Sequence, residues 1–173
     1  MANTKHAVVR TDNLGGTKGS EQLASIEFYS DASTPAAIDN GMIVALDSKL
    51  GREVYKAVAP TATTTKGNLY LVAGVELFYD QTTAHYLTEW VNEAGKPCRA
   101  YSLGASVGGY SVTAEALDGD TPEKGKYVTF EAGSTKAKVV STSDANTFGI
   151  IDDTDTTGFG DGKYTYFYIR LLK

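Results

Sequence analysis

The sequence predicts an all-β fold, either a sandwich or a partly closed barrel of short antiparallel strands, with at most one short helix and a flexible N-terminal arm. The 173 residues include 18 glycines and 11 tyrosines, and a chain rich in Gly, Thr, Ser and Tyr favours strands and turns over helices. Short apolar runs recur between turn signals that contain Gly, Asn and Asp. Residues 164–173 alternate between two faces, as a strand requires.

The length and the charge of the chain indicate the number of domains and the class of partner. The length suits a single domain, so we expect an extended arm over residues 1–24 and one β-rich domain over 25–173. The net charge of −5 and the pI near 5.0 argue against nucleic acid as a partner. We expect no membrane partner, because no apolar stretch reaches the roughly 18 residues of a membrane span. The N-terminus lacks the apolar run of a signal peptide, which indicates synthesis in the cytoplasm.

The predicted arm contains one short apolar patch, Ala7-Val8-Val9, followed by a segment rich in Gly, Thr and Ser. We predict that the arm becomes ordered on a neighbouring subunit, with Val8 and Val9 as its anchor. Arg10 and Leu14 complete the candidate contact residues. The alternative is a disordered terminus with no function of its own.

The first half of the predicted domain reads as strands separated by turns. Residues 25–30 form the first strand, and the Asn40-Gly41 turn signal leads into 42–46, an unbroken apolar run that predicts burial on both faces. Residues 52–59 then pair back on that strand. The most apolar segment, 69–77, is expected to be a central strand, and Gly74 within it marks a bulge or a close backbone approach.

Residues 82–94 are the one helix candidate. The residues that recur at helical spacing are Leu87, Trp90, Val91 and Ala94. Gly95 lies where a C-terminal cap belongs. The alternative is a strand, because residues 86–91 also alternate acceptably.

The second half of the chain is predicted to be strands up to its end. The predicted strands cover residues 98–103, 110–117, 127–131, 137–140, 148–152 and 164–173. An exposed loop is expected over 153–162. In the last strand, Phe167 and Ile169 lie on the expected core face together with Thr165 and Leu171.

The other face of the last strand is a candidate interface. It carries Tyr164, Tyr166, Tyr168 and Arg170. Tyrosine supplies a large contact area at low entropic cost and is favoured at interfaces and in sugar-binding clefts. The alternative is that these tyrosines simply cover one face of the sheet.

No catalytic constellation emerges from the sequence, so we expect a protein that is not an enzyme and needs no cofactor. Asp152, Asp153 and Asp155 are a weak candidate for calcium, because they place oxygen ligands on one acidic segment. They lack the spacing of an EF-hand and its closing Glu. His6 and His85 have no third ligand or nucleophile at a suitable spacing. We therefore expect no metal site.

Four segments together resemble the capsid decoration (auxiliary head) proteins of tailed bacteriophages. They are the Thr- and Gly-bearing N-terminal arm, Ile38-Asp-Asn-Gly-Met-Ile-Val-Ala-Leu-Asp47 with the Lys-Ala strand after it, Glu123-Lys-Gly-Lys-Tyr-Val128, and Thr147-Phe-Gly-Ile-Ile151. The resemblance implies a β-rich virion protein that binds the outer capsid surface and stabilises it. It further implies the major capsid protein as partner, self-association as a homo-oligomer, often a trimer, and an arm that contacts the capsid.

The residues alone are also compatible with two other functions. A phage tail-tube or connector protein would also be β-rich with one helix. A carbohydrate-binding or adhesin domain would use a cluster of exposed aromatic side chains in a groove, and a filled calcium site at Asp152 to Asp155 would favour it.

Overall fold

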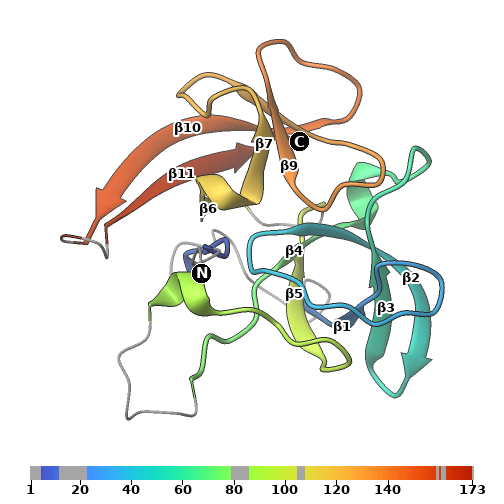
Figure 1. Ribbon diagram of the computed structural model, residues 1–173. Coiled ribbons are helices and arrows are strands. Elements are labelled where there is room, and N and C mark those ends of the chain that lie inside the picture. Colours follow the sequence, from blue (N-terminus) through green and yellow to red (C-terminus); the bar gives the residue numbers. More distant parts are fainter. Residues whose placement is uncertain are drawn as a thin grey trace.

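The computed structural model describes residues 5–11, 23–78, 86–104, 108–158, 160 and 163–172. It confirms the all-β class, with the strands divided between a closed barrel and an open sheet (Figure 1). The barrel is built by the first half of the chain and the sheet by the second half.

Five strands form the barrel. They are β1 (Leu23–Phe28), β2 (Ile43–Gly51), β3 (Val54–Val58), β4 (Leu69–Val72) and β5 (Cys98–Ser102). Their order around the barrel is β1-β3-β2-β4-β5, and β5 pairs with β1 to close it. The expected antiparallel arrangement holds for four of these pairings, whereas β1 and β3 run parallel. Closure removes the free edges that an open sheet of this size would leave.

The registers show which side chains fill the barrel. Val44 is opposite Tyr70, and Ala24 is opposite Ala100, so all four point to the inner face. Ile43, Leu69 and Leu71 point outwards, yet they are fully buried. The outer face of β2 and β4 is therefore covered by the second half of the chain, which confirms burial on both faces of the 42–46 run. The Ile43 amide donates to the Thr135 carbonyl across this boundary, at 2.7 Å.

Six strands form the open sheet. They are β6 (Gly109–Thr113), β7 (Leu117–Gly119), β8 (Tyr127–Phe130), β9 (Ala137–Val140), β10 (Thr147–Thr157) and β11 (Tyr164–Leu171). Their order is β6-β11-β10-β8-β9-β7. The last strand, β11, pairs with a neighbour on each side, and Phe167 and Ile169 are buried as predicted. Thr165, expected on the same core face, is exposed.

The hairpin of β10 and β11 is longer than the sequence indicated. β10 continues through Thr157, so residues 153–157 of the expected exposed loop are strand instead. Its register shifts between Ile151 and Asp153, which marks a bulge that lets the strand continue past the core. Figure 1 shows this hairpin projecting beyond the rest of the sheet.

The helix predicted over 82–94 is wrong for the described residues 86–94. Only Leu87–Glu89 form a single 3₁₀ turn. Asn92 instead pairs through its backbone with Ile38, with both N–H···O distances at 3.0 Å. This pairing holds the segment extended, because a residue bonded across to another strand cannot bond along a helix.

The arm predicted over residues 1–24 is also wrong where the structure describes it. Val8 and Val9 are 0% and 3% exposed in this chain's own core, and β1 already begins at Leu23. The Val8 carbonyl accepts from the Thr113 amide, and the Arg10 amide donates to the Ser111 carbonyl. Residues 8–10 therefore cover the open edge of β6, which leaves Val8 and Val9 unavailable as anchors on another subunit.

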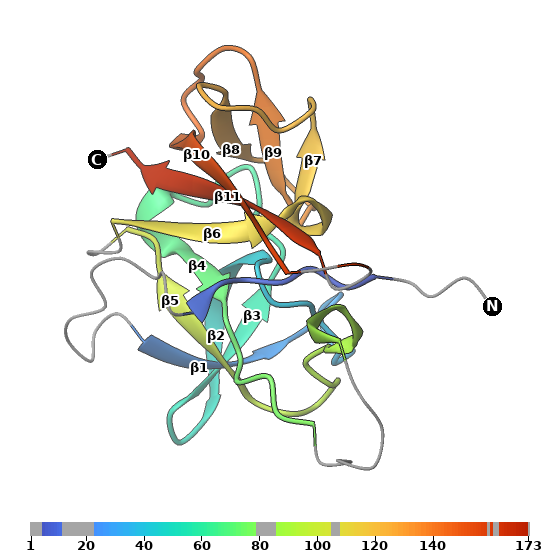
Figure 2. The ribbon, with the colours of Figure 1, turned by 90° about the vertical axis from the view of Figure 1, so that its left-hand side faces the viewer.

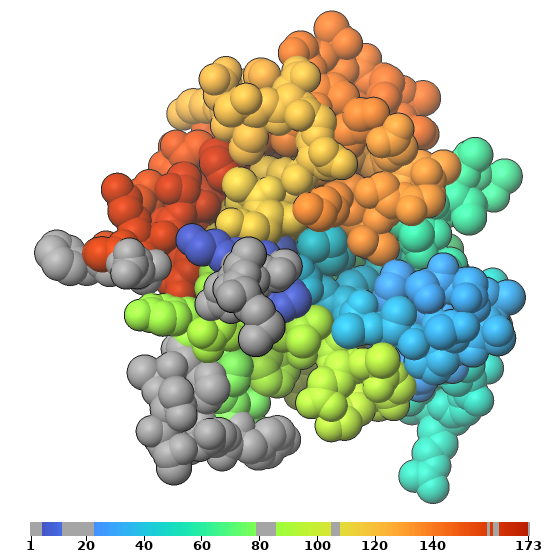
Figure 3. Space-filling model, viewed as in Figure 1, coloured from blue at the N-terminus to red at the C-terminus, as the bar shows by residue number. Residues whose placement is uncertain are grey.

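The same N-terminal segment, residues 5–10, also contacts the barrel side of the molecule. The His6 amide donates to the Thr88 carbonyl at 2.8 Å, and the His6 ring Nδ1 lies 2.7 Å from Asp39 Oδ1. Figure 2 shows the segment passing between the sheet and the barrel, and Figure 3 shows it in dark blue at the seam between them. The buried apolar residues of the barrel, the sheet and this segment form one continuous cluster.

Deletion of residues 2–11 is therefore expected to destabilise the fold. Burial of Val8 and Val9 alone contributes about 3 kcal/mol or more, and the edge of β6 would lose its hydrogen bonds. The free energy of unfolding from chemical denaturation checks this, with deletion of residues 2–4 as the matched control. A fully stable deletion of 2–11 would contradict the built-in role of this segment.

Candidate functional site

The predicted interface on β11 is largely used inside the protein. Tyr166 is only 5% exposed, and the Arg10 guanidinium lies over its ring, 5.4 Å from the ring centre. Tyr168 is half-buried and its hydroxyl lies over the backbone of Gly109, where no Cβ would fit. Tyr164 packs at a tilt against Tyr166 and is also half-buried. These tyrosines mainly cover one face of the sheet, which was the alternative interpretation of this pattern.

Two of the three acidic side chains of β10 are paired with arginines on the same face. Asp155 Oδ2 lies 3.3 Å from Arg10 Nη1, and Asp152 Oδ2 lies 3.1 Å from Arg170 Nε. Asp153 and Asp155 line a small hollow together with Arg10. The structure thus brings together residues from the predicted arm, the predicted calcium segment and the predicted tyrosine face.

The calcium alternative finds no support in this arrangement. The three acids lie on a strand, where Asp152 and Asp155 face arginines instead of one another. Across the ranges that the structure describes, no group of three or more His, Cys, Asp or Glu side chains is placed to hold a metal ion. Leu14 and His85 lie outside the described residues.

A second surface is built by the long connection between β4 and β5. Asn40 is fully buried, and its side chain makes two hydrogen bonds to the backbone of this connection. Its Nδ2 donates to the Gly74 carbonyl at 3.1 Å, and its Oδ1 accepts from the Gly74 amide at 2.8 Å. Asn92 Nδ2 donates to Asn40 Oδ1 at 2.9 Å and to the Ile38 carbonyl at 3.0 Å. A side chain on Gly74 would collide with the Asn92 amide, so the predicted close backbone approach at Gly74 is confirmed.

The buried hydrogen bonds of Asn40 and Asn92 fix the base of the connection between β4 and β5. This connection is apolar and exposed. Six large apolar side chains of the described residues are exposed, and four of them, Val75, Leu77, Tyr86 and Leu87, belong to this connection. They are 61%, 49%, 50% and 38% exposed respectively. Phe78 packs edge-on against Trp90 with ring centres 5.4 Å apart, which links its two described parts. We call Val75, Leu77, Tyr86 and Leu87 the apolar patch.

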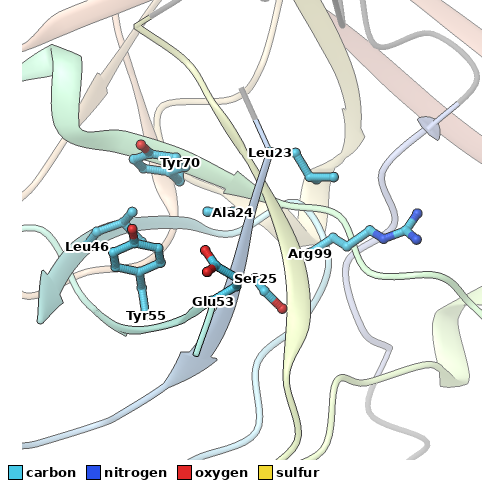
Figure 4. Close-up of a pocket in the computed structure, with 8 residues that line it drawn as sticks. All are labelled: Leu23, Ala24, Ser25, Leu46, Glu53, Tyr55, Tyr70 and Arg99. Atoms are coloured by element: carbon cyan, nitrogen blue, oxygen red, sulfur yellow. The ribbon is translucent and has the colours of Figure 1, made fainter. Parts of the chain in front are cut away.

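A third surface is a pocket of about 690 Å³ at one end of the barrel (Figure 4). All five barrel strands or their immediate ends contribute to its lining. Tyr55, Tyr70 and Leu46 belong to the inner face of the barrel, and Figure 4 shows them together on one side of β1. Arg99 extends away on the other side of β1 in this view. Deeper in the barrel, Ile26, Val44 and Ala57 are fully buried, so the barrel is filled below this opening.

Sequence reasoning missed both the apolar patch and the pocket. Asn40 was interpreted only as part of a turn, although its amide organises the connection. Tyr55 and Tyr70 are separated along the chain and come together only through the pairing of β3 and β4 with β2. Alternation within 52–59 could have placed Tyr55 and Ala57 on one face, but it could not have shown that the face ends in an opening.

No protein-family model, curated protein or solved structure matches this chain. Among the residues with described structure, no helix is both long and apolar enough to pass through a membrane. The functional interpretation therefore depends on the residues and on the geometry.

The buried network predicts a pH dependence of stability through Glu76. Its Oε1 accepts from Asn40 Nδ2 at 3.0 Å, and burial raises the pKa of the Glu76 carboxyl, although that hydrogen bond opposes part of the rise. A raised pKa means that the folded state binds the proton more tightly than the unfolded state. Stability is therefore lost as the pH rises from the unfolded pKa, about 4.3, through the folded pKa.

Glu76→Gln should raise the melting temperature at about pH 7, and the gain should vanish below about pH 4, where the native carboxyl is protonated too. Melting curves at the two pH values check this. Glu123→Gln, on an exposed turn, removes the same charge and serves as the control. An equal gain at both pH values would mean that desolvation of Glu76 is not the cause.

Proposed function

We propose that this protein is a non-enzymatic virion component that binds the outer surface of a tailed-phage capsid and stabilises or decorates it. The sequence resemblance described above supports this role. The structural observation that carries it is the apolar patch, in which four large apolar side chains are exposed on one connection. A concentration of exposed apolar side chains is typical of a protein–protein contact surface.

The patch suits a contact surface because its base is rigid. The Asn40–Gly74 and Asn92–Asn40 hydrogen bonds are buried, and they position the backbone before any partner arrives. A surface that is ordered in advance loses less conformational entropy on binding. The contact that the sequence assigned to the N-terminal arm is thus reassigned to the connection between β4 and β5.

The proposed partners are the major capsid protein and further copies of this chain. In this proposal, a homo-oligomer, possibly a trimer, presents several apolar patches to the capsid at once. Such multivalent attachment would make a modest contact per subunit sufficient for stable decoration. The negative net charge of −5 agrees with a protein partner in place of nucleic acid.

Co-sedimentation with particles of the source virus that lack this chain tests the proposal. The purified protein should sediment with the particles, and the double substitution Leu77→Ser and Leu87→Ser should weaken binding at least about tenfold, because two apolar contacts are lost. Leu50→Ser is the matched control, since Leu50 is 43% exposed but lies at the β2–β3 turn. Failure of the native chain to sediment, or unchanged binding by the double variant, would contradict the proposal.

A further inference from the structure

We propose that the pocket at the opening of the barrel binds one end of a neutral oligosaccharide, at a site separate from the apolar patch. The pocket at this opening has a volume of about 690 Å³, which lies within the range of ordinary ligand sites. Tyr55 and Tyr70 provide aromatic rings on its inner side, with Leu46 between the strands that carry them. Aromatic rings of this kind stack on the C–H faces of sugar rings.

The site is confined to this pocket. A second hollow of about 360 Å³ is lined by Trp90, Val75 and neighbouring residues, and it shares Ser25 and Arg99 with the first. Ser25 and Arg99 are directly opposite each other on the outer face of β1 and β5, whereas their neighbours Ala24 and Ala100 face the inside of the barrel, as Tyr70 does. The paired strands β1 and β5 therefore lie between the tyrosines and the second hollow. The pocket alone suits one end of an oligosaccharide.

The polar groups of the pocket suit hydroxyl groups. Within the described ranges, the side chains of Tyr55 and Tyr70 make no hydrogen bond or ion pair. A tyrosine hydroxyl both donates and accepts. Sugar hydroxyl groups can satisfy each of these atoms, whereas an aliphatic chain would leave them unpaired.

The charges at the opening favour a neutral ligand. Glu53 is paired with Lys49, with Oε1 and Nζ 3.8 Å apart, and Lys49 also lies 5.8 Å from the centre of the Tyr55 ring. Because both signs are present on the rim, neither a strongly acidic nor a strongly basic polymer gains a uniform attraction. The pocket is therefore assigned to neutral sugars.

The test is titration of the full chain with defined neutral hexasaccharides of glucose, mannose and N-acetylglucosamine, followed by calorimetry and by NMR. At least one should bind with a Kd below about 1 mM. Tyr55→Ala and Tyr70→Ala should each weaken that binding about tenfold or more through loss of aromatic contact. Tyr127→Ala removes another half-buried tyrosine, which lies on β8 of the open sheet and outside both hollows, and should leave binding unchanged.

Circular dichroism and melting curves establish that each variant is folded, and Tyr70→Phe provides a second variant that keeps the ring if Tyr70→Ala is unstable. The proposal is overturned if no hexasaccharide binds up to about 10 mM, or if folded variants at Tyr55 and Tyr70 bind as the native chain does. Binding of a proline-rich decapeptide in place of all sugars would also overturn it, because aromatic grooves can accept such peptides. Loss of sugar binding with retained sedimentation on particles would separate this site from the proposed capsid contact.

Discussion

The pairing of residues 8–10 with the open edge of β6 is the constraint on which the rest of the molecule depends. A sheet edge next to the core presents unpaired backbone groups that must be covered, and here the chain covers them with its own N-terminal segment. The same segment buries Val8 and Val9 and reaches the barrel through His6 and Asp39. The barrel, the sheet and the N-terminal segment consequently share one core instead of meeting as separate bodies.

This internal use of the N-terminal segment decides which surfaces remain for partners. Arg10 lies over Tyr166 and pairs with Asp155, so the tyrosine face is occupied by the chain itself. The exposed apolar side chains lie elsewhere, on the connection between β4 and β5, and the pocket lies at the opening of the barrel. Both are held by elements with buried hydrogen bonds or paired strands, which gives each surface a defined shape before binding.

The fold was predictable from the sequence as far as local patterns reach. Alternation placed Phe167 and Ile169 in the core, and the apolar run at 42–46 indicated a strand buried on both faces. Barrel closure and the parallel pairing of β1 with β3 were not predictable, because they depend on contacts between distant segments. The helix expected at 82–94 failed for a similar reason: Asn92 bonds to Ile38 and Asn40, 54 and 52 residues away. The pocket at the opening of the barrel was even harder to predict from the sequence, because Tyr55 and Tyr70 become neighbours only through strand register.

The proposed virion role is tested most directly by quantitative mass spectrometry of density-purified virus particles from the source culture. This chain is expected in the particles at about one copy, or about one-third of a copy, per major capsid protein, as symmetric decoration requires. A few to some tens of copies per particle would instead place the chain in the tail or connector. Its absence from the particles would contradict the virion role altogether.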